Sequence, residues 1–396
     1  MKHNYGLTIK AAFLGYVVQA IVNNFLPLLF IELQHEYRLM LSQITFFITL
    51  NFLIQLLVDL LSTPLIRKLG YRLSMQLSNL CVIAGLLLLT ILPDKFDNHY
   101  AGLLLCVCLY AVGGGLQEVL VSPIVEACPT KNKEAAMSLL HSFYCWGHVG
   151  VVLGSTLFFT FFGIANWRVL ALLWCLIPLV DLVLFVIVPI AQLEETAPQQ
   201  GKGHFALFSH RIFWILLLMM VCAGASEQAV SQWASAFAER GLGISKQLGD
   251  LLGPMLFAVC MGISRTIYGV LGARVDLQKF MSISVMLCII AYLTIILAPV
   301  PLLTLGACAL TGFAVGIFWP GTFSLAAAHL KHGGTLMFAL LALGGDLGCA
   351  GGPTLCGSIM ALTADNMRAG IGSAVIFPLL LGLGLYLVCR QRKLTC

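Results

Sequence analysis

Six charged side chains stand inside stretches of sequence that are otherwise apolar, and they are the first candidates for chemistry. A charged side chain at the centre of a bilayer costs about 2.5 to 3.5 kcal/mol on insertion scales, so such residues usually face inward and are paired or functional. The six are Asp59, Glu118, Asp181, Glu227, Arg265 and Asp346. Because one arginine cannot neutralise five acids, we expect some of these carboxyl groups to be protonated and suited to carrying a proton.

Glu118 is the strongest candidate for a proton-carrying group. Its helical neighbours at minus four, minus three and plus four are Gly114, Gly115 and Ser122, all small. This face of the helix either packs closely against another helix or opens a cavity beside the carboxyl group. The alternative is a packing face whose acid is hydrogen-bonded to a neighbouring helix.

Glu227 is the second candidate, and it lies among other polar side chains. Gln228 and Gln232 stand one turn apart, and Trp233 follows. Amides and an indole offer hydrogen bonds and a stacking surface for a polyhydroxylated solute. The alternative for Glu227 is a gating ion pair.

The other charged residues divide between function and structure. Asp346 lies among glycines that permit close helix approach or a kink, so a proton site and a structural hinge are both open. Asp59 and Arg265 are near helix ends, where they can snorkel or form a latch, and we expect structural roles for both. Asp181 stands alone in its helix, and the sequence offers no functional explanation for it.

One helix carries a polar stripe. His141, Tyr144 and His148 fall at i, i+3 and i+7 in the apolar stretch 135–162. His148 is a candidate proton relay, since histidine titrates near neutrality, although such histidines are more often hydrogen-bonded packing residues. Trp233 and Trp319 lie deep in their spans and either line a pathway or fill the core.

The composition shows what kind of element must position these residues. The chain has 396 residues, of which 60% are hydrophobic and 10% charged, with a mean hydropathy of +0.96. Soluble domains carry about 25% charged residues, and about 20 apolar residues cross a bilayer as a helix. We therefore expect an all-α polytopic membrane protein whose twelve spans are 7–31, 42–66, 74–93, 100–127, 135–162, 168–190, 211–237, 247–272, 279–299, 302–328, 335–361 and 369–389.

The loops predict orientation and organisation. Most Lys and Arg residues fall in short loops on the side of the N-terminus, which places both termini in the cytoplasm. A polar connection at 191–210 separates a six-helix bundle at 1–190 from a second one at 211–396. The glycine-rich stretch 113–118 has a partner at 312–316 in the second half, and such parallel halves, with a site between them near the midplane, are typical of transporters.

Other classes of protein are excluded by what the sequence lacks. It contains no phosphate loop, no His-Glu-x-x-His and no credible Ser/His/Asp arrangement, so we expect no enzyme, no cofactor and no ATP-driven transport. The fourteen cysteines are scattered singly without metal spacing and read as reduced, small hydrophobes. The excess charge of +5 lies in loops, which fits membrane topology and not nucleic-acid binding.

No Asn-x-Ser/Thr acceptor for glycosylation occurs in the sequence, which favours a bacterial plasma membrane. We expect a monomer surrounded by lipid there.

The basic loop 65–72 after the second span resembles that of the major facilitator superfamily, although an acid usually stands where Arg67 is. A closer resemblance is to its fucose permease branch of sugar:proton symporters. It rests on the glycines 113–115 before Glu118, on Ser122-Pro123, on the Gly224-x-x-Glu227 pattern, on the stretch 318–326 and on Gly262-x-x-Arg265. The resemblance implies twelve helices in two halves that rock about a central cavity lined by the first, fourth, seventh and tenth helices.

Two positions depart from the branch. Its helix-one Asn-Asp pair stands here as Asn23-Asn24, and its helix-five Phe-Asn becomes Phe143-Tyr144. Glu118 keeps the acid of the pattern and so becomes the preferred proton site. We expect coupling through Glu118, Glu227, Asp346 and His148, and solute contacts from Asn24, Gln117, Tyr144, Gln232, Trp233 and Trp319.

The function expected from these residues is symport of a small neutral polyhydroxylated solute, most simply a sugar, with protons. A proton-coupled exporter of lipophilic or cationic compounds is the alternative, because the excess of acids over Arg265 suits a cation. A sensor or scaffold on the same fold is a third class, which no feature of the sequence favours.

Overall fold

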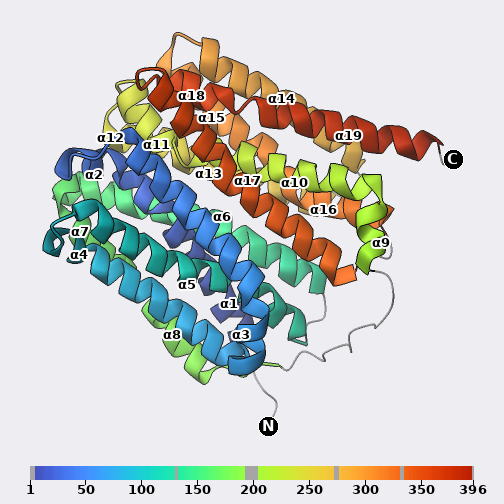
Figure 1. Ribbon diagram of the computed structural model, residues 1–396, viewed down its shortest axis with the longest axis horizontal. Coiled ribbons are helices and arrows are strands. Elements are labelled where there is room, and N and C mark those ends of the chain that lie inside the picture. Colours follow the sequence, from blue (N-terminus) through green and yellow to red (C-terminus); the bar gives the residue numbers. More distant parts are fainter. Residues whose placement is uncertain (1–4, 130–132, 192–203, 272–275, 331–333, 395–396) are drawn as a thin grey trace. The chain divides into compact units, whose positions relative to one another are not determined.

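The computed structural model describes residues 5–129, 133–191, 204–271, 276–330 and 334–394, and within these ranges the chain is helical with no strand (Figure 1). Eleven of the helices described are long and apolar enough to cross a membrane. The predicted span 335–361 coincides with a further helix, α17 (Gly334–Leu362), of 29 residues. At 1.5 Å per residue that helix is about 43 Å long, enough to cross a bilayer. The prediction of an all-α polytopic membrane protein is confirmed.

The chain divides into two compact units, each described here by itself. Unit 1 comprises Met1–Glu194 together with Lys246–Leu251, and unit 2 comprises Glu195–Ser245 and Leu252–Cys396. Most of the predicted connection at 191–210, residues 192–203, lies outside the described residues. So do Lys2, Lys131, Lys202, Arg274 and Lys331, which contributed to the predicted orientation.

Unit 1 is built from long helices with short connections. Two predicted spans, 42–66 and 74–93, correspond to two helices that meet at a kink within α3, at Gly70, where φ is +75°. A positive φ of this kind is accessible to glycine without strain, so the basic loop is a single-residue turn. The elements of unit 1 before the polar connection are α1 (Tyr5–Asn24), η1 (Leu26–Leu29), α2 (Phe30–Glu36), α3 (Leu41–Leu89), α4 (Leu92–Lys95), α5 (His99–Ala127), α6 (Lys133–Phe162), η2 (Ile164–Asn166), α7 (Trp167–Trp174) and α8 (Leu176–Ile187).

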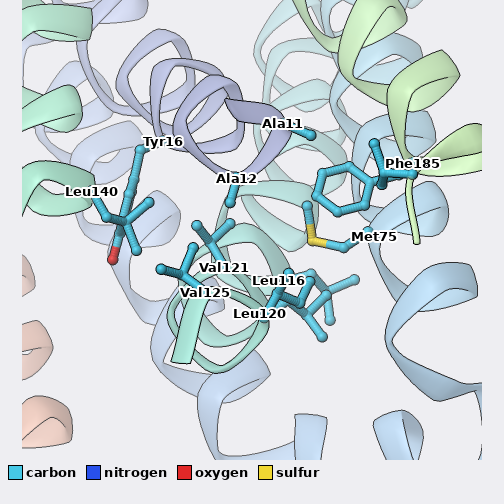
Figure 2. Packing of buried hydrophobic residues seen from close by; sticks show 12 residues of the cluster. Ala11, Ala12, Tyr16, Met75, Leu116, Leu120, Val121, Val125, Leu140 and Phe185 are labelled. Atoms are coloured by element: carbon cyan, nitrogen blue, oxygen red, sulfur yellow. The ribbon is translucent and has the colours of Figure 1, made fainter. Parts of the chain in front are cut away.

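The core of unit 1 lies where α1, α3, α5 and α8 meet. Figure 2 shows the small side chains of Ala11 and Ala12 on α1 above the apolar face of α5, with Met75 of α3 beside the ring of Phe185 on α8. All four of these side chains are completely buried. Alanine at this face lets α1 approach α5 closely, which brings the polar residues further along both helices within reach of each other.

Arg72 fixes the end of α8 in unit 1. Its guanidinium group donates to the carbonyl oxygens of Phe185 (2.8 Å), Val186 (2.6 Å) and Val188 (2.6 Å). The last carbonyl groups of a helix have no intrahelical donor, and a cation there also interacts favourably with the helix dipole. The arginine that follows the Gly70 turn therefore ties α3 to α8.

A polar cluster outside the apolar core joins α2, α4 and α7 of unit 1. Arg168 forms ion pairs with Glu36 (2.6 Å) and Asp94 (3.0 Å), and Tyr37 donates its hydroxyl proton to Asp94 (3.0 Å). Burial and the hydrogen bond to Asp94 raise the pKa of Tyr37 above its ordinary value. The phenol therefore remains a proton donor to Asp94 throughout the physiological pH range.

Unit 2 repeats the pattern of long helices, with two π-helical segments, η3 and η4. Its helices α10 and α17 run side by side in Figure 1. Tyr292 of α14 donates to the Ser226 carbonyl oxygen of α10 (2.8 Å), which anchors the middle of that helix. The elements after the polar connection are α9 (His204–Ser209), α10 (Arg211–Ser231), α11 (Ala234–Ala236), η3 (Phe237–Gly241), α12 (Lys246–Asp250, within the segment assigned to unit 1), η4 (Leu251–Met255), α13 (Leu256–Leu271), α14 (Leu277–Leu297), α15 (Pro301–Val315), α16 (Phe318–His329), α17 (Gly334–Leu362), α18 (Met367–Ser373) and α19 (Ile376–Leu394).

Glycines bring the backbones of α10 and α17 into contact. A Cβ atom added at Gly348 would overlap the Val221 carbonyl oxygen, and one added at Gly352 would lie 2.5 Å from the Ala225 carbonyl oxygen. Both partner atoms belong to the α10 backbone, which cannot move aside as a flexible side chain can. The glycines around Asp346 thus permit close helix approach, one of the two arrangements that the sequence left open.

We expect Gly348→Ala to destabilise unit 2 by about 1 to 3 kcal/mol, the usual range for overpacking. Gly351→Ala is the matched control on the same helix, because a Cβ atom there would meet nothing within 4 Å. That change should alter stability by no more than about 0.5 kcal/mol. Thermal unfolding of the two purified variants in detergent measures both effects, and equal melting temperatures would contradict the backbone contact.

Candidate functional site

Glu118 lies in a strip of polar groups that joins three helices of unit 1. Gln19 of α1 donates its Nε2 proton to Glu118 Oε2 on α5 at 2.6 Å. One turn away along the same two helices, the Tyr16 hydroxyl shares a hydrogen bond with Ser122 Oγ at 3.2 Å. The Tyr16 hydroxyl also lies 3.4 Å from His141 Nδ1 on α6. Of the predicted small neighbours of Glu118, Gly114 lies against Val22 of α1 and Gly115 against Gln55 and Val58 of α3, so this face packs closely against other helices.

The strip continues to one of the two neighbouring asparagines of α1, Asn24. Asn24 donates to the carbonyl oxygen of Ala20 (2.9 Å) and to the Tyr144 hydroxyl (3.5 Å) on α6. Asn23 instead accepts hydrogen bonds from Asn51 Nδ2 (3.0 Å) and Gln55 Nε2 (2.8 Å), both on α3. Of the neighbouring pair, Asn23 holds α1 against α3, whereas Asn24 belongs to the strip. We call Tyr16, Gln19, Asn24, Glu118, Ser122, His141 and Tyr144 the Glu118 strip.

The structure shows the surroundings of three residues of unit 1 that the sequence analysis singled out: His148, Gln117 and Asp181. His141, and not the favoured His148, contacts the strip, while His148 is buried with 2% of its surface exposed. Gln117 points away from Glu118 and donates to Asn79 Oδ1 at 3.0 Å. Asp181 stands alone in its own helix but has a partner on another, because Asn79 of α3 donates to its Oδ2 atom at 2.8 Å.

The reason for these outcomes is helical geometry. Gln117 and Glu118 are adjacent, and successive residues of a helix are turned by about 100°, so the two side chains face different helices. The partners of Asp181, Asn79 and Gln117, are 102 and 64 residues away in the chain. The only signal in the sequence was that Asn79, Gln117 and Asp181 are polar residues in apolar stretches. That signal did not show that the three side chains meet.

Unit 2 holds a chain of polar side chains that starts from an ion pair. Arg265 of α13 lies 3.3 Å from Glu227 of α10, and the two side chains are 20% and 10% exposed. Gln228 donates to Glu227 Oε1 (3.3 Å), and Gln232 donates to Gln228 Oε1 (3.0 Å). The sequence left a gating ion pair open as the alternative for Glu227; the structure pairs Glu227 with Arg265, and a gating role stays a prediction.

The two tryptophans predicted to stack on a solute, Trp233 and Trp319, both make contacts within unit 2. Trp233 donates its indole proton to the Pro353 carbonyl oxygen at 3.1 Å and is only 1% exposed, so neither face of its ring is open in this conformation. Trp319 packs its ring edge against Gly345 and is partly exposed, next to Phe323. Asp346 follows Gly345 on α17 and is 6% exposed.

The arrangement provides two acids, Glu118 and Glu227, in different chemical surroundings. Glu118 accepts a hydrogen bond from the Gln19 amide, and the strip to which it belongs also contains hydroxyls and an imidazole, groups that can bind a neutral solute and relay protons. Glu227 faces a guanidinium group, which stabilises its ionised form.

Comparison with known proteins shows which family has this helical architecture. A family model described as Major Facilitator Superfamily matches residues 11–353. No curated protein matches the sequence. Among solved structures, a D-xylose-proton symporter is similar with a TM-score of 0.79, 14% identity and 97% of each chain covered.

Two other solved structures show the same fold. A variant of the E. coli fucose:proton symporter FucP has a TM-score of 0.67 and 16% identity, covering 98% of this chain and 99% of the other. A bacterial homologue of the human lysosomal transporter Spinster, inward-facing and unoccupied, has a TM-score of 0.76 and 15% identity with 98% of each chain covered. With the family model spanning most of its length and this helical architecture, the chain belongs to the Major Facilitator Superfamily.

Proposed function

We propose that this transporter carries a small neutral polyhydroxylated solute, a sugar in the simplest case, together with protons by alternating access. The observation that carries the proposal is the Glu118 strip, where one acid lies among neutral donors and acceptors. Sugars are bound by such groups, whereas a charged solute needs opposite charge in a bilayer. Two of the solved structures with this fold are described as proton symporters of fucose and of D-xylose.

In this proposal Glu118 binds the transported proton. The N–H group of Gln19 favours the ionised carboxylate, since a hydrogen bond donated to a carboxylate stabilises its charge. Adding a proton removes that charge, so the strip can lose water around a bound solute at lower cost. Solute binding and proton binding then favour each other, which is the requirement for symport.

Asn24 and Tyr144 are the proposed solute contacts in unit 1, and Gln232 and Trp319 in unit 2. Gln117 donates to Asn79 and Trp233 donates its indole proton to the Pro353 carbonyl oxygen, so both have supporting roles in this conformation. In unit 2, Glu227 is a further candidate for proton coupling whose charge is balanced by Arg265. Asp346 and His148 remain secondary candidates for proton coupling. We place the protein in a bacterial plasma membrane with both termini in the cytoplasm, because most basic residues lie in loops on that side.

The test is uptake into proteoliposomes that contain the purified protein. Fucose, xylose, galactose and glucose are offered with an imposed proton gradient, with an imposed sodium gradient, and with neither. We expect accumulation of at least one sugar only with the proton gradient. Uptake driven by sodium alone, transport of tetraphenylphosphonium in place of any sugar, or no solute flux at all would each overturn the proposal.

A further inference from the structure

A second buried acid, Asp181, lies in unit 1 apart from the Glu118 strip. It occupies the middle of α8, away from both helix ends, and its side chain has no exposed surface. Among the described residues, the side chains that reach it are amides: Asn79 Nδ2 at 2.8 Å and Gln117 Nε2 at 3.5 Å. Both contacts end on the same carboxyl oxygen, Oδ2.

The orientation of these amides is fixed by a backbone group. Asn79 Nδ2 also donates to the Met75 carbonyl oxygen at 3.2 Å, and a carbonyl can only accept, so the nitrogen end of the amide must lie there. Asn79 Oδ1 then accepts the proton of Gln117 Nε2 at 3.0 Å. The oxygen of Gln117 faces α1, where a Cβ atom on Gly15 would lie 2.7 Å from it. The amides therefore present their protons to Oδ2 of Asp181 and not to Oδ1.

The other carboxyl oxygen, Asp181 Oδ1, is buried and has no hydrogen-bond donor within the described part of the chain. A carboxylate has two accepting oxygens, and a buried oxygen without a donor is unfavourable even before its charge is considered. A carboxylic acid fits this environment better, because Oδ2 keeps its two amide donors while the protonated group carries no buried charge.

No charged group of the described residues acts on Asp181. Several charged and titratable groups on the helices around it are directed elsewhere: Arg72 of α3 to carbonyl oxygens at the end of α8, Tyr16 of α1 to Ser122 and His141, Glu118 of α5 to Gln19, Arg168 of α7 to Glu36 and Asp94, and Cys175 to the Ile83 carbonyl oxygen, while Lys10 and Lys68 are exposed. An ionised Asp181 would thus be a buried charge without a counter-ion, which is the costliest state for a carboxyl group.

We propose that Asp181 is a second proton-binding site of this transporter, held as a neutral carboxylic acid and oriented by Asn79 and Gln117. A proton from water adds to Oδ1 and returns to water when the site ionises. Gln117, which contacts Asp181, adjoins Glu118 in the sequence of α5, so the two acids are linked through neighbouring residues of one helix. The inference deepens the proposed function by adding a proton site to the same unit, but protonation of Asp181 does not depend on which solute is carried.

Infrared difference spectroscopy of the full-length protein tests the inference directly, since a protonated carboxyl group has a carbonyl stretching band that a carboxylate lacks. At neutral pH we expect Asp181→Asn to lose one component of this band. Asp250→Asn is the matched control, because Asp250 is equally buried but lies 2.9 Å from Lys246 in an ion pair, and its replacement should leave the band intact. An unchanged band in Asp181→Asn, or loss of the wild-type band on adding Na⁺, would overturn the proposal.

A second variant keeps the test valid if Asp181→Asn does not fold. Asn79→Leu removes the shorter donor to Oδ2, and a carbonyl group that loses a hydrogen bond absorbs at higher frequency, so the Asp181 component should move upwards. A component that stays at the same frequency would contradict the assignment.

Stability as a function of pH supplies an independent readout. The folded site holds the Asp181 proton at pH values where the unfolded chain has already lost it, so the melting temperature of the wild type should fall from acidic to neutral pH more than that of Asp181→Asn. Parallel melting curves would count against the proton site. If the infrared band is assigned to Asp181 but no sugar is taken up, the proton site stands and the proposed function fails. If sugar is taken up with a proton gradient but the Asp181 band is missing, the proposed function stands and the proton site fails.

Discussion

Glu118→Gln is expected to abolish proton-driven accumulation of the solute while exchange of the solute across the membrane continues. The amide is nearly the same size as the acid, and its oxygen can still accept the hydrogen bond from Gln19 Nε2. It cannot bind and release a proton at physiological pH. The solute site should therefore remain formed, while its coupling to the proton gradient is lost.

The size of the effect follows from the energy stored in the gradient. One pH unit corresponds to about 1.4 kcal/mol per proton, which supports at most about tenfold accumulation of a neutral solute. In Glu118→Gln the accumulation ratio should fall to about 1, and the rate of solute exchange should become insensitive to pH over the range in which Glu118 titrates. Uptake of labelled solute into proteoliposomes measures the first quantity, and counterflow measures the second.

Glu32→Gln provides the control, since it makes the same chemical change on α2, away from the Glu118 strip. This variant should accumulate the solute as the wild type does. If Glu118→Gln retains proton-driven accumulation with unchanged affinity for the solute, Glu118 is not the coupling acid. Glu227 and Asp346 would then be the next residues to replace.

The largest effect on stability is expected for Arg265→Gln. This change leaves the Glu227 carboxylate buried without the guanidinium group that lies 3.3 Å away. Removing one partner of a buried ion pair costs about 3 to 5 kcal/mol, and the lower end applies here because Arg265 is one-fifth exposed. Unit 2 should therefore melt at a clearly lower temperature in Arg265→Gln.

A double-variant cycle separates the ion pair from the size of the side chains. Glu227→Gln together with Arg265→Gln removes both charges, and most of the stability lost in Arg265→Gln should return, because neither partner is then left charged. Thermal unfolding of the wild type, the two single variants and the double variant gives the coupling energy. Additive effects of the two changes would show that the pair contributes little.

Arg240→Gln is the matched control for this cycle. It breaks the ion pair between Arg240 and Asp365, whose atoms lie 2.8 Å apart but whose side chains are each 40% exposed. Exposed pairs contribute about 0 to 1 kcal/mol, so this variant should melt close to the wild type. The contrast between the two arginines tests whether burial decides the energy of an ion pair in unit 2.

Several features of the site could be predicted from single positions. The bilayer makes any charged residue in an apolar stretch conspicuous, so Glu118, Glu227 and Arg265 were found without a structure. The small residues beside Glu118 and the glycines beside Asp346 indicated close helix approach, because only small side chains allow it. Roles as proton or solute contacts remain predictions for all of these residues.

Other features depended on contacts between distant segments. Nothing in the sequence joins Asp181 of α8 to Asn79 of α3, and both lie in apolar helices with no local motif. The choice between His141 and His148 was likewise open, since both lie on one face of α6. The two histidines are seven residues apart, about 10 Å along the helix axis, so only the axial position of α6 relative to α1 brings His141, and not His148, to the hydroxyl of Tyr16.

The sequence by itself determined that this is a polytopic helical membrane protein and which of its residues are costly in a bilayer. It could do so because a helix in lipid satisfies its own backbone hydrogen bonds, so that span, length and composition are local properties. The tertiary structure alone decided which helix each polar side chain faces. Adjacent residues such as Gln117 and Glu118 point about 100° apart, and which partners meet them depends on how helices far apart in the chain pack together.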